Sequence, residues 1–156
     1  MAIAARVKWF LQSHGVEYDV LSHAHTESSR AAADAARVPQ NRLAKCVLLE
    51  DERGYVMAVL PASERVELAK LNAALHRELE LADEAELPSL FRDCALGAVP
   101  PLGTAYNIPT VVEDSLLSAP EVWFEGGDHE DLVHVRGAAF LSLLAGSRHG
   151  SFTARH

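Results

Sequence analysis

Two apolar segments separated by a short polar turn constrain the fold more than any other feature of the sequence. Residues 43 to 50 and 55 to 60 are rich in Val and Leu, and Asp51-Glu52-Arg53-Gly54 between them has the composition of a hairpin turn. The pattern predicts a β-hairpin, and we expect this hairpin to form the middle of a sheet.

Helical spacing and alternation on both sides of the hairpin predict the other elements. Helices are expected over residues 2 to 14, 28 to 37, from Ser63, 83 to 91 and 137 to 144, and strands over 17 to 21, 110 to 113, 121 to 125 and 132 to 135. Strands that follow one another through short turns favour an α+β fold, with a mixed, largely antiparallel sheet and helices packed outside it. Residues 146 to 156 are small and polar and are predicted to form a flexible tail.

Composition bounds the class of protein. A chain of 156 residues, 49% hydrophobic and 23% charged, is typical of one globular domain, here residues 1 to 145. Its longest apolar runs are too short for a membrane helix, no signal-peptide pattern begins the chain, and its two cysteines predict no disulfide framework. We therefore expect a cytoplasmic protein that does not bind membranes. The net charge of −8 argues against a broad grip on DNA or on the body of an RNA.

Lys45 is the first residue whose chemistry needs an explanation, because its strand is otherwise apolar. Strand alternation places Lys45 on the same face as Leu43, Val47 and Leu49. Either its stem covers core while its ammonium reaches water, or the ammonium meets an anion such as phosphate in a pocket.

The segment from Gly97 to Gly103 is the second such feature, with two glycines and two prolines in seven residues. Glycine permits close approach of the backbone to a ligand, and proline holds the following turn rigid. The segment is therefore either a tight turn or a loop whose peptide N–H groups bind an oxyanion.

Other chemistries find less support in the sequence. His23, His25, His129 and His134 lack the spacing of a metal site, and Ser63 with His129 and Asp128 lacks the G-x-S-x-G turn of a serine hydrolase. The aromatic side chains Trp9, Trp123 and Phe124 are expected in the core, although an exposed one could stack on a base.

Three motifs in register resemble the YbaK/prolyl-tRNA-synthetase-associated family of editing domains. They are Leu43-Ala44-Lys45-Cys46-Val47-Leu48-Leu49, Gly97-Ala98-Val99-Pro100-Pro101-Leu102-Gly103 and Phe124-Glu125-Gly126-Gly127-Asp128-His129 through to Phe140-Leu141. The family's strand lysine falls on Lys45, and its G-x-x-x-P signature falls on Gly97 to Pro101. The resemblance covers nearly the whole chain.

This resemblance implies a pocket for the aminoacylated 3′ adenosine of tRNA, with no metal or other cofactor. Lys45 would bind the terminal nucleotide or the aminoacyl group, and the backbone around Gly97 and Pro101 would stabilise the ester carbonyl. Water would attack the ester with help from the ribose 2′-hydroxyl. The residues expected to border the amino acid are His25, Thr26, Ser28, Ala98, Val99, Gly127 and His129.

The same resemblance predicts a free-standing deacylase that removes alanine or cysteine from tRNA-Pro, with an aminoacyl-tRNA synthetase as a further possible partner. The Gly127-Asp128-His129 sequence resembles the alanine-removing branch more than the cysteine-removing branch. Cys46, directly after Lys45, departs from the family pattern and is expected on the opposite face of the strand. The competing hypothesis is a non-catalytic module that uses the same pocket for an adenosine-bearing ligand or a protein partner.

Overall fold

A computed structural model describes residues 3–95 and 98–155 and has an eight-stranded mixed sheet as its centre. The strands follow the order β1-β8-β7-β2-β3-β6-β9, and β4 and β10 form a separate pair. The short strand β5 pairs with the far end of β2, on the same edge as β7. The strands are β1 (Asp19–Ser22), β2 (Leu43–Asp51), β3 (Gly54–Pro61), β4 (Glu64–Val66), β5 (Glu80–Leu81), β6 (Thr110–Glu113), β7 (Glu121–Glu125), β8 (Asp131–Arg136), β9 (Arg148–Gly150) and β10 (Thr153–Arg155). The α-helices are α1 (Ala5–Ser13), α2 (Ser29–Ala36), α3 (Leu68–Leu75), α4 (Leu87–Leu90), α5 (Asp114–Leu117) and α6 (Gly137–Leu143), and the 3₁₀ turns are Gln40–Arg42, Glu84–Glu86 and Gly103–Tyr106.

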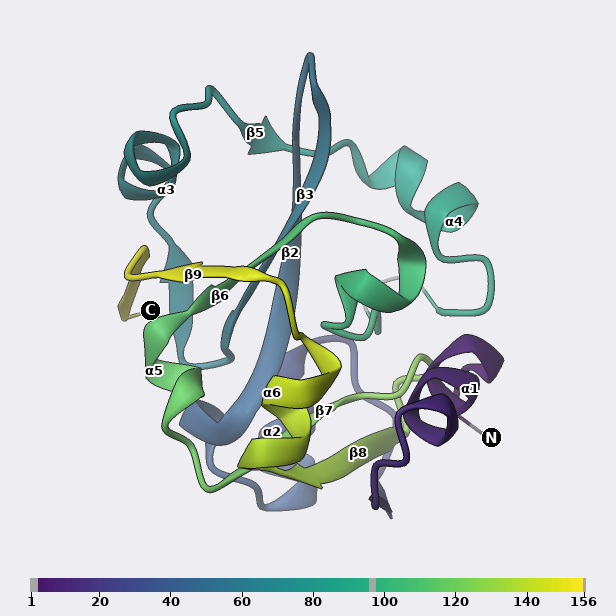
Figure 1. Cartoon of the computed structure of the whole chain (residues 1–156). Coiled ribbons are helices and arrows are strands. Elements are labelled where there is room, and N and C mark those ends of the chain that lie inside the picture. Colours follow the sequence, from purple (N-terminus) through teal and green to yellow (C-terminus); the bar gives the residue numbers. More distant parts are fainter. Residues whose placement is uncertain (1–2, 96–97, 156) are drawn as a thin grey trace.

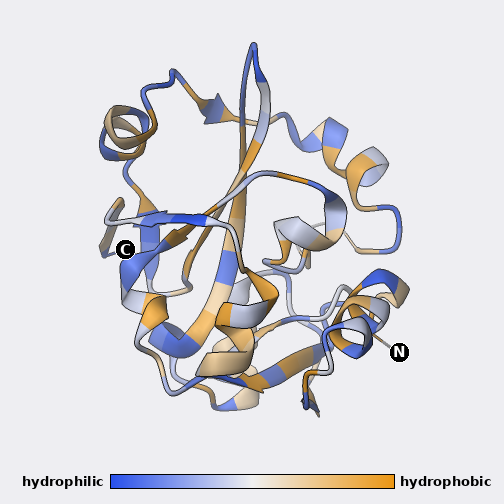
Figure 2. Ribbon diagram, viewed as in Figure 1, coloured by the Kyte–Doolittle hydropathy of each residue, from blue (hydrophilic) through white to orange (hydrophobic). Residues whose placement is uncertain are grey.

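The predicted hairpin is confirmed and lies in the middle of the sheet. β2 and β3 pair in antiparallel register from Ala44 opposite Pro61 to Asp51 opposite Gly54. Gly54 has φ of 125°, a conformation that glycine adopts readily and that closes the turn. The hairpin projects beyond the rest of the sheet (Figure 1), and its polar tip contrasts with its apolar body (Figure 2).

The sheet is mixed, as predicted, and helices cover both of its faces. β1/β8, β8/β7 and β2/β3 are antiparallel pairs, whereas β2/β7, β3/β6 and β6/β9 are parallel. One face packs against α1 and α6 through a core that includes Phe10, Phe124 and Phe140. The opposite face packs against α2 around Leu43 and against α3 around Leu71. Figure 1 shows α6 in front of the sheet and α2, fainter, behind it.

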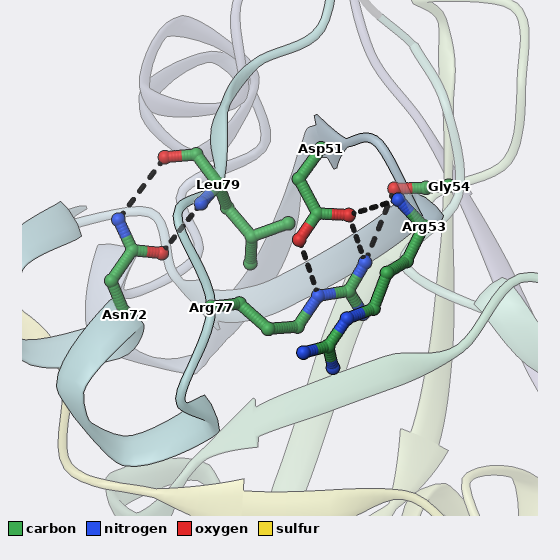
Figure 3. A network of polar contacts seen from close by, with 6 residues as sticks. All are labelled: Asp51, Arg53, Gly54, Asn72, Arg77 and Leu79. Carbon is green, nitrogen blue, oxygen red and sulfur yellow. Dashed lines mark hydrogen bonds and ion pairs between the residues drawn. The ribbon is translucent and has the colours of Figure 1, made fainter.

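A clamp holds the chain at the tip of the hairpin (Figure 3). The Arg77 guanidinium donates from Nε to Asp51 Oδ2 at 2.7 Å and from Nη2 to Asp51 Oδ1. Asn72 holds the backbone of Leu79 with two hydrogen bonds, of 3.1 Å to its carbonyl and 2.9 Å from its N–H. The segment after α3 is thereby fixed against the end of β2.

The C-terminal segment differs from the flexible tail that the sequence predicts. Residues after Ala145 form β9 and β10, and Phe152 is only 1% exposed. The buried carboxylate of Glu113 accepts hydrogen bonds through Oε1 from the N–H groups of Phe152 at 2.9 Å and Thr153 at 3.0 Å. One large apolar side chain and one buried acceptor therefore hold a segment whose composition is otherwise that of a tail.

Two further predictions were wrong. The helix expected from Ser63 begins at Leu68, because the intervening residues form β4 and pair with β10. Trp9 was expected in the core but is 63% exposed, since Val7, Phe10 and Leu11 supply the buried face of α1. Within the described ranges, no helix has both the length and the apolar character needed to cross a lipid bilayer.

Candidate functional site

The candidate site lies where one edge of β2 is not covered by another strand. On this edge β2 pairs with β7 only at Leu43 and Ala44, and with β5 only at Leu49 and Glu50. Between these pairings, no described strand lies beside residues 45 to 47. Ser29 from the first turn of α2 and Val99 from the loop at residues 98 to 101 line a cavity with Cys46 there, and a second loop, residues 126 to 130, follows β7.

Lys45 extends from one face of this uncovered stretch. Its Nζ donates a hydrogen bond to the carbonyl oxygen of Ala62 at 3.3 Å. Partial burial lowers the pKa of Lys45, the nearby Arg30 guanidinium lowers it further, and the Glu64 carboxylate opposes both effects. The ammonium is therefore half-buried in a mixed-charge setting, where a bound anion would stabilise its charged form.

Cys46 extends from the opposite face, as strand alternation predicts, and lines a small cavity of about 110 Å³. Its Sγ donates to the carbonyl oxygen of Val99 at 3.5 Å and lies 3.9 Å from that of Pro100. Burial raises the pKa of the Cys46 thiol to about 12, so the thiol is neutral near pH 7. The cavity is mainly apolar and is lined by Ser29, Cys46, Leu48, Met57, Leu87, Phe91 and Val99.

The two loops at the site are tied to each other. The N–H of Ala95 donates to the carbonyl oxygen of Gly127 at 2.7 Å. Gly127 has φ of 117°, and a Cβ there would lie 3.0 Å from the Cβ of Ala4, so glycine is favoured both by conformation and by space. Of the predicted loop residues, Ala98 and Pro101 are buried, Val99 borders the cavity, and Gly97 lies outside the described residues.

The structure brings together His25, Thr26 and His129. The N–H of Thr26 donates to the carbonyl oxygen of His129 at 3.3 Å, and the two histidine rings are 5.2 Å apart. The Glu27 carboxylate lies 2.8 Å from Nε2 of His25 and 3.9 Å from Nε2 of His129. The His129 side chain is only 4% exposed, so these loops pack closely around it.

Local turns determine how these loops are held. Asp128 Oδ1 accepts from the N–H groups of Glu130 at 3.0 Å and Asp131 at 2.9 Å, while the intervening His129 adopts φ of 64°. Ser28, the remaining predicted site residue, accepts from the N–H of Ala31 at 3.1 Å. Its hydroxyl therefore serves as the N-cap of α2.

Glu125, at the end of β7, is a site residue that sequence reasoning missed. It is 2% exposed, and neither carboxylate oxygen accepts a hydrogen bond from the described residues. Burial, with a smaller contribution from Asp128, raises the pKa of Glu125 to about 8. The available signal was an acidic residue at the end of an alternating strand, immediately before two glycines.

The candidate site thus combines a cation, a small apolar cavity and closely packed loops at one sheet edge. No three or more His, Cys, Asp or Glu side chains are grouped to hold a metal ion within residues 3–95 and 98–155. Such an arrangement offers an anion a site on one face of β2 and a small apolar group a site on the other face, at the same uncovered edge.

Comparisons with solved structures identify the fold. A protein described as a candidate trans-editing enzyme for prolyl-tRNA synthetase matches with a TM-score of 0.83 and 25% identity, over 96% of this chain and 95% of that one. The hypothetical protein APE2540 matches with a TM-score of 0.83 and 22% identity, over 96% and 99% of the two chains. A protein from Marinobacter aquaeolei, described as a candidate signal transduction protein, matches with a TM-score of 0.79 and 20% identity, and the chain spans 30% of its length.

A family model assigns the class. The model for the aminoacyl-tRNA editing domain matches residues 23–143, which include every described residue of the candidate site. No curated protein is similar enough in sequence to be matched. The chain belongs to the aminoacyl-tRNA editing domain family. It is an aminoacyl-tRNA deacylase, an enzyme that hydrolyses the ester bond between an amino acid and tRNA.

Proposed function

We propose that the chain acts in trans on tRNA-Pro that carries the wrong amino acid and removes alanine or cysteine from it. The observation that carries this proposal is the cavity of about 110 Å³ beside Cys46, which lies on the opposite face of β2 from the Lys45 ammonium but at the same uncovered edge of the strand. A cavity of this size has room for the methyl group of alanine or the –CH2SH group of cysteine. The similarity to a candidate trans-editing enzyme for prolyl-tRNA synthetase supports tRNA-Pro as the substrate.

Lys45 is proposed to bind the 3′-terminal nucleotide through its positive charge. Its ammonium already lies in a pocket with partial burial, where an ionic hydrogen bond is stronger than in open water. The loop from Gly97 to Pro101 would place the ester carbonyl, and its peptide N–H groups would stabilise the oxyanion that forms on attack. The contact between Cys46 and the Val99 carbonyl keeps this loop against β2.

Water is proposed to be the nucleophile, with the tRNA 2′-hydroxyl assisting it. Cys46 does not suit covalent catalysis, because a thiol with a pKa of about 12 is almost entirely protonated near pH 7. His25, Thr26 and His129 would border the amino-acid end of the pocket, where Gly127 leaves the loops close together. Shape, with little side-chain chemistry, would then select the substrate.

The test is deacylation of tRNA-Pro charged with alanine, cysteine or serine, with Pro-tRNA-Pro as the control substrate. We expect selective hydrolysis of one mischarged species by the wild type. Lys45→Ala should lower kcat/KM by about 10- to 100-fold, the value of one charge-assisted hydrogen bond. The matched control is Lys8→Ala, which removes an exposed lysine of α1 and should leave the rate unchanged.

Two outcomes would contradict the proposal. Equal hydrolysis of Pro-tRNA-Pro would show that the cavity does not select small amino acids. No turnover of any substrate, at enzyme concentrations near that of the tRNA, would favour a module that binds an adenosine-bearing ligand without hydrolysing it.

A further inference from the structure

A second pocket, of about 380 Å³, lies on the Lys45 face of the sheet. Arg30 from α2 and Arg155 from β10 line it, together with the polar side chains of Asn41 and Ser63. These residues come from four separate segments of the chain. The two arginines are therefore brought together by the fold and are not neighbours in the sequence.

The pocket adjoins Lys45. The Lys45 ammonium donates to the carbonyl of Ala62, and the residues on either side of Ala62 both line the pocket. Arg30 and Glu64, which also line it, are the two charged groups that shift the pKa of Lys45. Lys45 and the pocket consequently share one electrostatic environment.

The balance of charge in this region is positive, although the chain as a whole carries −8. Three cations, Arg30, Arg155 and Lys45, outnumber two carboxylates, Glu64 in the pocket lining and Glu113, which both lie within hydrogen-bond distance of the Thr153 hydroxyl. The Nε of Arg30 donates to Gln40 at 3.4 Å, which orients its guanidinium. Two arginines that line one pocket beside Lys45, in an acidic protein, indicate a site for an anion with more than one negative oxygen.

We propose that this pocket binds a phosphodiester of the single-stranded 3′ end of tRNA, adjacent to the nucleotide that Lys45 holds. The inference rests on the proposed function, because it assumes that Lys45 faces the terminal nucleotide. Guanidinium groups bind phosphate through paired N–H donors, and Ser63 and Asn41 add neutral hydrogen-bond donors. The pocket would bind the sugar-phosphate backbone of the 3′ end and would make no contact with the body of the tRNA.

The test uses an uncharged, fluorescently labelled RNA oligonucleotide ending in CCA, with binding followed by anisotropy. We expect Arg30→Gln/Arg155→Gln to weaken binding about tenfold or more at low salt. The slope of log Kd against log salt should also fall by about 0.7 for each phosphate that the protein no longer neutralises. Arg53→Gln is the matched control, since it removes an arginine at the opposite end of the β2–β3 hairpin and should change neither quantity.

A second measurement separates phosphate binding from catalysis. Aminoacyl-adenosine carries the ester but no phosphodiester, so the double variant should hydrolyse it as the wild type does, while KM for an aminoacylated CCA oligonucleotide rises. Arg30→Lys/Arg155→Lys keeps the charge but loses the paired donors and should bind with intermediate affinity. If the double glutamine variant does not fold, the RNA affinity of the double lysine variant still tests the inference.

The outcomes distinguish this inference from the proposed function. RNA affinity unchanged in both double variants, with the salt slope unchanged in the glutamine pair, would overturn the inference, whatever the deacylation rates. Displacement of the RNA by an acidic peptide as effectively as by unlabelled CCA oligonucleotide would also overturn it and would indicate a protein partner. RNA binding that depends on Arg30 and Arg155 without any hydrolysis would refute the proposed function and leave the phosphodiester site standing.

Discussion

Two carboxylates at strand ends of the same sheet meet opposite conditions. Asp51, at the tip of the hairpin, accepts hydrogen bonds from the Arg77 guanidinium and from the N–H of Arg53, and Arg77 is the main reason that its pKa falls to about 2. Glu125, beside the candidate site, accepts no hydrogen bond from the described residues, and burial raises its pKa to about 8.

The difference lies in hydrogen bonding. The paired Asp51 carboxylate stabilises the folded protein, whereas the Glu125 carboxylate, buried with no hydrogen-bond partner in the described chain, is costly to ionise there. At the hairpin tip the Asp51 carboxylate is paired with the Arg77 guanidinium, so its charge is compensated in the folded protein (Figure 3). Near the site, Thr26 Oγ1 and Asp128 Oδ2 are, like Glu125, buried without a hydrogen bond among the described residues. Buried polar atoms of this kind reduce stability, and they are typical of regions selected for ligand binding.

The largest expected effect comes from filling the cavity at the site end of β2. Cys46→Leu adds two heavy atoms to the lining and should lower kcat/KM for the preferred mischarged tRNA by at least the roughly 10- to 200-fold range that one misplaced methylene causes in an apolar pocket. The near-isosteric Cys46→Ser is the control and should stay close to the wild type. A fully active leucine variant would mean that the amino acid binds elsewhere.

The next effect concerns Glu125 and depends on pH. Its pKa is raised in the folded protein, so the contribution of its proton to stability is complete below the ordinary value near 4.5 and is lost as pH rises to about 8. We expect Glu125→Gln to be more stable than the wild type by about 2 to 4 kcal/mol at pH 9, and within about 1 kcal/mol of it at pH 4.5. Urea denaturation at the two pH values measures this, and a gain of equal size at both would contradict it.

Asp51→Asn should act in the opposite direction. The lowered pKa of Asp51 means that its contribution is present above about pH 4 and is lost as pH falls through about 2. At pH 7 the variant should therefore melt about 2 to 5 °C below the wild type, and the difference should shrink toward pH 2. A constant difference across this range, followed by circular dichroism, would assign the loss to packing and not to charge.

The smallest effect is expected for Arg53→Gln at the same hairpin tip. The Arg53 side chain is exposed, and its backbone N–H, which the substitution keeps, makes the hydrogen bond to Asp51. The free energy of unfolding should change by less than about 0.5 kcal/mol. A larger loss would place Arg53 in the clamp beside Arg77.

The hairpin was predictable because its signals are local. Two apolar segments rich in Val and Leu and the polar turn between them lie within about twenty positions, and the pairing found in the structure follows from them. Lys45 was predictable for the same reason, since a charge within an apolar strand is visible without knowing what surrounds it.

The rest of the site depends on contacts between distant segments. The cavity beside Cys46 needs Ser29, Phe91 and Val99 to meet, and no local pattern predicts that. The same holds for the pocket of Arg30 and Arg155, which joins opposite ends of the chain. The exposure of Trp9 escaped prediction because helical spacing does not say which apolar residue of α1 the core leaves out.

The two hydrogen bonds that Glu113 accepts from the N–H groups of Phe152 and Thr153 bear on how the protein is handled in the laboratory. Removing the last few residues, by cloning or by proteolysis, would leave a buried carboxylate without these donors and would also delete Arg155 from its pocket. A loss of activity after C-terminal trimming would then not distinguish a damaged fold from a damaged site. An affinity tag is therefore better separated from Arg155 by a long flexible spacer than fused directly to the end of β10.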